Sequence, residues 1–186
     1  MNGGVWAPPG GVFGPGRATA LARSPRPTQS TPASRRFRHN VPGRPTRPVR
    51  RSEQRRAAVI AAYQHDLTGQ PLAEALGRDA APFTRALAWA AVERAPEFDE
   101  LIGDHAHGWT IERIAPLERN ILRVALVEML YGDAVPADQP ISPEGAIDEA
   151  VQSAKTFCGA DAPGFVNGIL DAILREVREN ARYEHS

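Results

Sequence analysis

Four arginines, Arg50, Arg51, Arg55 and Arg56, cluster where the first helical segment of this sequence should begin. Positive charge at a helix N-terminus opposes the helix dipole and costs roughly 0.3–1 kcal/mol per residue. Guanidinium groups match phosphate oxygens in shape and charge, so the cluster indicates contact with a phosphate-rich polyanion. A general preference for Arg, shown by Lys155 as the only Lys, explains the residue type but not its position.

Charge divides the sequence into two parts, although the formal net charge of the chain is zero. Residues 1–56 contain twelve Arg and one acidic residue, Glu53, and carry a net charge of +11. Residues 57–186 contain nine Arg, one Lys and 21 Asp or Glu, and carry −11. A basic arm joined to an acidic body favours a polyanionic partner, while a solvated tail is the simpler interpretation of the far N-terminus.

Residues suited to catalysis or metal binding do not form a recognisable set. The sequence lacks the GxxxxGK[ST], HExxH and GxGxxG motifs. His105 and His107 offer two imidazoles without a third ligand nearby, and Cys158 has no adjacent His to act as a base. We therefore predict no enzymatic activity, no cofactor and no metal. A single Cys excludes an intrachain disulfide and fits a reducing, cytoplasmic compartment.

The first 50 residues differ in composition from the rest. They hold nine Pro and seven Gly and no acidic residue, so they are predicted to be disordered. An acid-free, Arg-rich segment also fits an organellar transit peptide, and a misassigned start codon is a third explanation. The sequence does not separate these three.

Beyond this segment, apolar residues recur at helical spacing and no stretch alternates with period two. Ser52 is expected to cap the first helix and Gly69 to end it. An all-α domain is predicted over 51–182, with a tail at 183–186 and no segment long and apolar enough to span a membrane. The expected helices are 53–69, 71–77 as a short turn or a helix of one to two turns, 82–108 with a break or kink at Pro96, 109–132 with a start near Pro116, 143–157 and 163–182. The fourth should be the most buried.

Several of these segments resemble, in order and spacing, the NusB family of bacterial transcription antitermination factors. The resemblance covers about residues 50–178 and rests on ERNILRVALVEML at 118–130, IDEAVQSAK at 147–155 and FVNGILD at 165–171. It implies two packed three-helix bundles without catalysis. It also implies that the protein binds a short single-stranded RNA element, boxA, in ribosomal RNA leaders. The implied partners are NusE, a ribosomal small-subunit protein, and an RNA polymerase complex that resists termination.

The resemblance and the residue chemistry together give a set of expected site residues. RNA is expected to contact Arg50, Arg51, Arg55, Arg56, Asp161 and Asn167, and NusE to contact Tyr63, Glu118 and Phe165. Simpler roles stay open: both aromatics as core anchors, Glu118 as a favourable charge at a helix start and Asp161 as a helix cap.

Asn167 and Gly168 stand in the first turns of the last helix, although Gly weakens a helix by roughly 1 kcal/mol relative to Ala. We expect Gly168 to admit a close approach by a neighbouring helix or a partner. Asn167 is suited to hold a neighbouring loop or an RNA base.

Two other functions compete with an RNA-binding transcription factor. One is a helical protein-interaction module that has lost RNA binding, which the arginine cluster argues against. The other is an accessory domain of the kind fused to ribosomal RNA methyltransferases, which would require a methyl-donor-binding domain that this sequence lacks. The resemblance also leaves self-association into a homodimer open.

Overall fold

The computed structural model describes residues 49–136 and 140–184, and these belong to a unit that spans residues 45–186. Within the described residues the secondary structure is helical and includes no strand, which confirms the predicted all-α class. The predicted disorder of the first 50 residues falls almost wholly outside this part.

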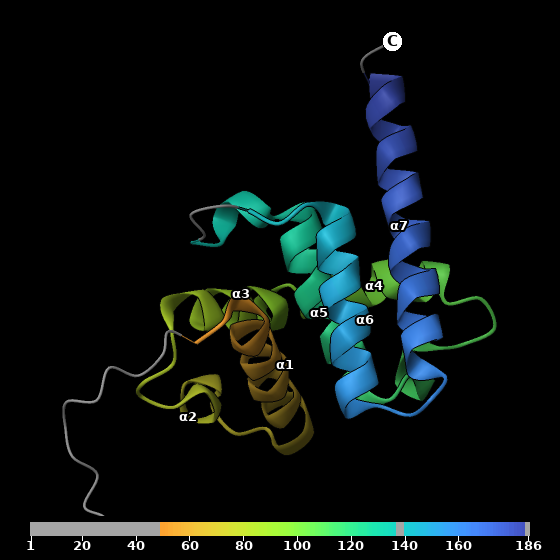
Figure 1. The fold of residues 1–186 in the computed structure, drawn as a ribbon. Helices are drawn as coiled ribbons and strands as arrows, with labels where there is room; N and C mark the ends of the chain where they lie inside the picture. Colours follow the sequence, from red (N-terminus) through yellow and green to blue (C-terminus); the bar gives the residue numbers. More distant parts are fainter. Residues whose placement is uncertain (1–48, 137–139, 185–186) are drawn as a thin grey trace, which may run out of the picture. The chain divides into compact units, whose positions relative to one another are not determined.

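The helices follow one another with short connections (Figure 1). Their bounds are α1 (Arg51–Thr68), α2 (Leu72–Leu76), α3 (Pro82–Glu93), α4 (Ala95–His105), the 3-10 turn η1 (Ile111–Arg113), α5 (Pro116–Leu130), the 3-10 turn η2 (Gly132–Ala134), α6 (Pro143–Phe157) and α7 (Ala162–Glu184). Proline begins α3, α5 and α6, since its fixed φ suits a first helical turn, where the missing N–H costs nothing. The expected break near Pro96 is present at Arg94, between α3 and α4.

The start of α1 differs from the prediction. The helix begins at Arg51, so Ser52 is not its cap. The Glu53 carboxylate instead accepts a hydrogen bond from the Arg50 backbone N–H at 3.0 Å, which satisfies a donor at the helix start. The predicted end is correct: Gly69 has φ 70°, and its N–H donates to the His65 carbonyl.

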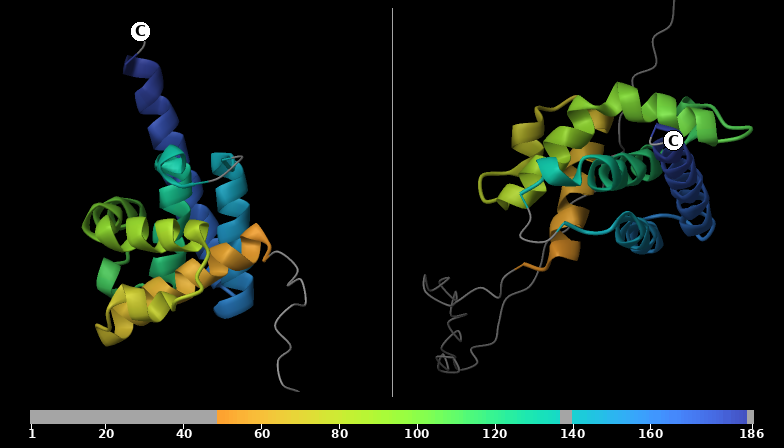
Figure 2. Two further views of the ribbon diagram at one scale, coloured as in Figure 1. Left: turned by 90° about the vertical axis from the view of Figure 1, so that its left-hand side faces the viewer. Right: turned by 90° about the horizontal axis from the view of Figure 1, so that it is seen from above.

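Helix α5 forms the centre of the domain. Every residue from Asn120 to Met129 is buried, which confirms it as the most buried helix. It contacts α1 and α3 on one side and α6 and α7 on the other, and α4 packs against both α5 and α7. Seen from above, α5 runs between the α3–α4 layer and α6 (Figure 2). Within these contacts, two groups of three helices can be traced, α1–α3–α5 and α5–α6–α7, and α5 belongs to both.

Two apolar residues at helical spacing lie outside the core. Leu67 is 59% exposed in the last turn of α1, and Val177 is 38% exposed on the C-terminal half of α7. The last turns of α7 extend beyond its neighbouring helices (Figure 1). Among the described helices, none has the length and apolar character needed to cross a membrane.

Candidate nucleic-acid interface

Arg55 is a structural residue of the domain interior. It is 9% exposed, and its Nε and Nη2 donate to the two carboxylate oxygens of Glu128 on α5 at 2.7 and 2.9 Å. Glu149 on α6 lies 3.9 Å from its Nη1. Because this guanidinium is already paired and enclosed, its placement does not support the predicted RNA contact.

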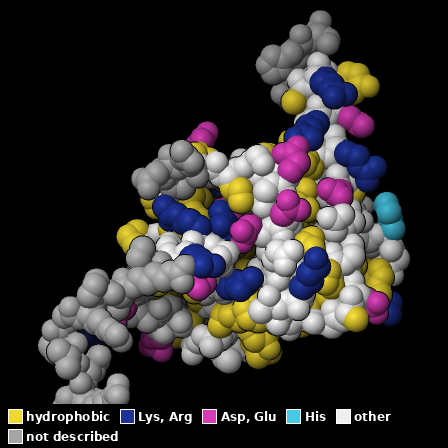
Figure 3. Space-filling view, viewed as in Figure 1, with side chains coloured by type: hydrophobic (Ala, Val, Ile, Leu, Met, Phe, Trp, Pro, Cys, Tyr) yellow, Lys and Arg dark blue, Asp and Glu magenta, His cyan; other side chains and the backbone are white. Residues whose placement is uncertain are grey.

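The other three arginines of the cluster, Arg50, Arg51 and Arg56, keep their charges available, and we call them the arginine surface. The first two are exposed and Arg56 is half-buried. None of the three forms an ion pair with a carboxylate of the described residues. Arg51 lies over the Phe83 ring at 4.3 Å, and the buried Nε of Arg56 has no hydrogen-bond partner in this part of the chain. Lys and Arg side chains gather on the same face, near the start of α1 (Figure 3).

Helical geometry explains the different fates of adjacent arginines. Arg51 and Arg55 are one turn apart, and both approach the ring of Phe83 on α3. Arg56 is rotated by about 100° around the helix from Arg55, at 3.6 residues per turn, and so leaves the interior. The sequence cluster therefore contains one interior residue and three that can reach a ligand.

The start of α7 carries Asp161 and Asn167, both exposed. The Asp161 backbone carbonyl accepts a hydrogen bond from the Phe165 N–H at 3.2 Å, which places Asp161 at the beginning of the helix. Asn167 donates to Asp171 at 2.7 Å, one turn along the same helix, so the expected bond to a neighbouring loop is wrong. A Cβ on Gly168 would meet nothing within 4 Å. Among the described residues no neighbouring helix approaches Gly168, so that part of the expectation is wrong. The close approach of a partner to Gly168 stays a prediction.

An aromatic pair lies near the start of α7. The rings of Phe165 and Trp109 are 6.1 Å apart at 57°, and the Arg113 guanidinium lies 5.3 Å from the Trp109 ring. Trp109 is 50% exposed, while Phe165 is half-buried against the core. Tyr63 is half-buried on α1, and no ring contact within the described residues joins it to Phe165. The sequence interpretation missed Trp109, although a large aromatic in the polar stretch HAHGWT was a usable signal.

Glu118 is half-buried in the first turn of α5, and its side chain forms no hydrogen bond or ion pair to a described residue. Burial raises the pKa of its carboxyl group. Burial, and then the negative charge of Glu118, raise the pKa of the Cys158 thiol, so Glu118 lies close to the end of α6. A partly desolvated carboxylate without a partner is suited to receive a hydrogen-bond donor or cation from another molecule.

A separate polar network holds α1, α4 and α5 together. Arg123 donates to both oxygens of Asp99 at 2.8 and 2.5 Å, and Arg119 and Asn120 donate to Asp66 at 2.8 and 3.1 Å. Burial alone would raise the pKa of Asp66. The Arg119 hydrogen bond and charge, the Arg123 charge and the Asn120 hydrogen bond outweigh burial and lower it. These arginines are therefore committed to the fold, unlike the arginine surface.

The two histidines considered as metal ligands do not form a site. His105 pairs with Glu176 on α7 at 2.7 Å, and its other ring nitrogen faces the Leu101 carbonyl at 2.9 Å. Over the ranges that the structure describes, no group of three or more His, Cys, Asp or Glu side chains could hold a metal ion.

Comparisons with known proteins all identify NusB proteins as relatives of this chain. The NusB family model matches residues 52–175. The transcription antitermination protein NusB of Geobacillus kaustophilus is 39% identical over 130 residues, covering 67% of this chain and 95% of that protein. NusB of Symbiobacterium thermophilum is 35% identical over 145 residues, covering 69% of this chain and 91% of that protein.

Solved structures agree with the sequence comparison. NusB of T. maritima has a TM-score of 0.60 at 29% identity, covering 69% of this chain and 92% of that one. A structure of the antitermination factors NusB and NusE in complex with double-stranded RNA has a TM-score of 0.56 at 26% identity, covering 68% and 96%. On the family model and these identities, the chain belongs to the NusB family.

Proposed function

We propose that this protein is a transcription antitermination factor that binds boxA-type RNA together with NusE in the bacterial cytoplasm. It performs no catalytic step: it holds the nascent ribosomal RNA transcript near RNA polymerase so that the complex resists termination. Named relatives are antitermination proteins, and a related NusB has been solved with NusE and RNA, which supports the proposal.

The arginine surface carries the RNA half of the proposal. Arg50, Arg51 and Arg56 lack carboxylate partners within the described residues, whereas Arg55, Arg119 and Arg123 in the same domain are paired. Phosphate oxygens of RNA supply the missing acceptors. Asp161, at the start of α7, is assigned to the edge of the RNA site by the family resemblance. Asn167, on the same helix, is assigned to RNA because its amide can both donate and accept hydrogen bonds.

The NusE half of the proposal uses the other polar and aromatic groups. Glu118 offers a partly desolvated carboxylate that has no partner in the described part of the chain, and Phe165 with Trp109 offers an aromatic anchor. Tyr63 belongs to this set by family resemblance. RNA and NusE then contact different residues, so substitutions can separate the two activities.

Fluorescence anisotropy of a labelled boxA-type RNA, with a scrambled control, tests the proposal. The full chain is titrated with and without NusE at several salt concentrations. We expect tighter binding to boxA than to the scrambled RNA, strengthened by NusE. If three arginines neutralise phosphates on a single strand, the slope of log K against log[salt] is about −2. Replacing Arg50, Arg51 and Arg56 by Ala should remove most of this slope.

Two controls decide between alternatives. Arg94→Ala removes an arginine that pairs with Glu97 at 3.1 Å on α4, and it should leave RNA binding unchanged. A duplex of the same sequence, used as competitor, tests the predicted preference for a single strand. Equal, weak binding to boxA and scrambled RNA without any effect of NusE would contradict the proposal and leave a helical protein-interaction module.

A further inference from the structure

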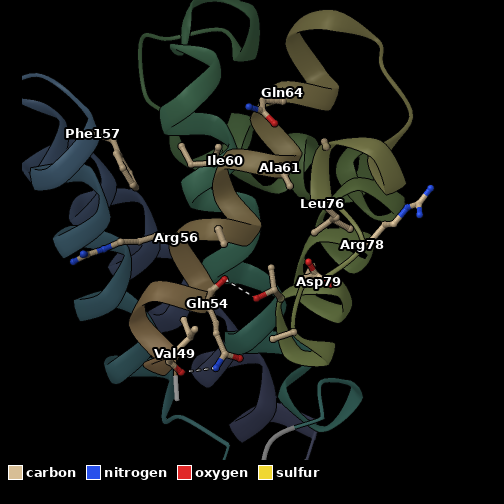
Figure 4. A pocket seen from close by; sticks show the side chains of 16 residues that line it. Val49, Gln54, Arg56, Ile60, Ala61, Gln64, Leu76, Arg78, Asp79 and Phe157 are labelled. Carbon is tan, nitrogen blue, oxygen red and sulfur yellow. Dashed lines mark hydrogen bonds between the residues drawn. The ribbon is translucent and has the colours of Figure 1, made fainter. Parts of the chain in front are cut away.

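A shallow groove of about 730 Å³ crosses the exposed face of α1 beside the arginine surface. Small and aliphatic residues of α1, Ala57, Ile60 and Ala61, form its floor. The α2–α3 loop lies on one side of α1 and Phe157, at the end of α6, on the other (Figure 4). This volume falls in the range of roughly 300–1,000 Å³ typical of small-molecule sites.

Polar groups at the groove are suited to a ligand with hydrogen-bonding edges. The amide of Gln64 is exposed and forms no hydrogen bond to a described residue, whereas the amide of Gln54 donates to the Val49 carbonyl at 2.8 Å. Arg56 extends from α1 on the same side as Phe157 (Figure 4), and its buried Nε has no acceptor in this part of the chain. A buried N–H without a partner is unfavourable, so an acceptor supplied by a ligand would stabilise the complex.

Charge and position favour a nucleic-acid strand. Asp79 is the only carboxylate among the described lining residues, and Arg78 lies beside it, so with Arg56 the lining is net positive. Val49 lines one end of the groove, next to Arg50 and Arg51. An unpaired nucleotide combines an apolar base face, polar base edges and an anionic phosphate, which matches this set of groups.

We propose that this groove receives an unpaired base of the RNA strand whose phosphates rest on the arginine surface. The base stacks on Phe157 and the aliphatic floor, and Gln64 and Arg56 donate to its edge or to the adjoining phosphate. This inference rests on the proposed function and adds what arginine–phosphate contacts cannot supply, because phosphate contacts position a strand and base contacts select its sequence.

Filling the groove tests the proposal. Ala57 is exposed, so Ala57→Trp occupies the floor without disturbing the core. Ala73→Trp, on an exposed position of α2 outside the groove lining, is the matched control. Anisotropy is measured with the full chain, NusE and the boxA-type RNA, and with the same RNA carrying an abasic site at each position in turn. Circular dichroism checks that both variants fold.

We expect Ala57→Trp to weaken RNA binding by about tenfold, as for the loss of one stacked base, with an unchanged salt slope. One abasic position should weaken binding to the wild type and to Ala73→Trp but not to Ala57→Trp. Gln64→Ala should reduce discrimination between boxA and the scrambled RNA.

Three other outcomes each have a separate meaning. Wild-type affinity in Ala57→Trp, with arginine substitutions still effective, would overturn the groove proposal alone. Loss of NusE binding in Ala57→Trp with RNA binding by the free chain intact would also overturn it, because the groove would then be a protein site. Failure of the wild type to prefer boxA over scrambled RNA would refute the proposed function and, with it, this inference.

Discussion

Replacing the adjacent residues Arg55 and Arg56 by Ala should separate folding from RNA binding. Arg55 forms the two-bonded pair with Glu128 across α1 and α5, at side-chain exposures of 11% and 6%. Arg56 forms no ion pair within the described residues and lies beside the groove. The same change in residue type therefore acts on two different interactions.

The structure gives the expected magnitudes. Arg55→Ala leaves the Glu128 carboxylate buried without its cation, and breaking a buried pair in this way lowers the free energy of unfolding by about 3–5 kcal/mol. The whole free energy of unfolding of such a domain is roughly 5–15 kcal/mol, so this substitution would remove much of its stability. Arg56→Ala removes a surface charge and should change stability by less than about 0.5 kcal/mol. It should make the salt slope of RNA binding shallower by about 0.7.

Urea unfolding followed by circular dichroism measures the first effect, and anisotropy at several salt concentrations measures the second. The double substitution Arg55→Met with Glu128→Met removes both charges and should recover most of the lost stability. A loss below about 1 kcal/mol in Arg55→Ala would refute the reasoning about burial. The salt slope of RNA binding could also be unchanged in Arg56→Ala but reduced in the double variant Arg55→Met with Glu128→Met. This result would mean that Arg55 and not Arg56 contacts RNA.

Three further substitutions test the partner surface and α7. Trp109→Ala should weaken NusE binding by at least about tenfold in a calorimetric titration. Trp89→Ala is the matched control and should not weaken it, because Trp89 is similarly exposed, at 48% compared with 50% for Trp109. Glu118→Gln should weaken NusE binding yet raise the free energy of unfolding at pH 7, by no more than about 0.5 kcal/mol. Burial raises the folded-state pKa of Glu118, so the wild type loses stability as pH rises from the ordinary value of 4.5 through the raised value. The increase in the free energy of unfolding of Glu118→Gln, measured with urea, should therefore vanish below pH 4.5. An increase that persists below pH 4.5 would mean that the buried charge of Glu118 is not its cause. Gly168→Ala should stabilise α7 by about 0.5–1 kcal/mol, because the added Cβ meets no atom of the described residues within 4 Å. Weaker binding of NusE or RNA by this variant would reveal a close partner.

Apolar periodicity and proline positions were sufficient to predict most of the fold. The prolines at the starts of α5 and α6, the interruption near Pro96 and the end of α1 at Gly69 all depend on local backbone preferences, which a sequence displays directly. The exposure of Leu67 and Val177 could not be inferred in the same way. Whether an apolar residue at helical spacing is covered depends on the length of the neighbouring helices, which is a property of tertiary packing.

Residue type indicates candidate site residues, but it does not give the role of each one. The four arginines form one cluster in the sequence, and spacing alone does not say which side chain meets a buried acid. Glu128 was the informative residue: it stands in the apolar run RVALVEML of the most buried helix, where a carboxylate requires a cationic partner. A search for that partner among the arginines of a facing helix would have separated Arg55 from the residues expected to contact RNA.

The Arg55–Glu128 pair also affects RNA binding without touching RNA. It helps to fix α1 against α5, and α1 carries Arg56 and the floor of the groove. Glu128→Gln, which removes the buried anion but keeps the shape, should therefore lower the free energy of unfolding and loosen α1. RNA affinity should then fall because a smaller fraction of molecules presents the arginines correctly, while the number of phosphate contacts in the bound state stays the same. The distinguishing result is weaker binding with a wild-type salt slope, restored by conditions that stabilise the fold. A slope reduced as in Arg56→Ala would instead mean that the pair shapes the phosphate contacts themselves.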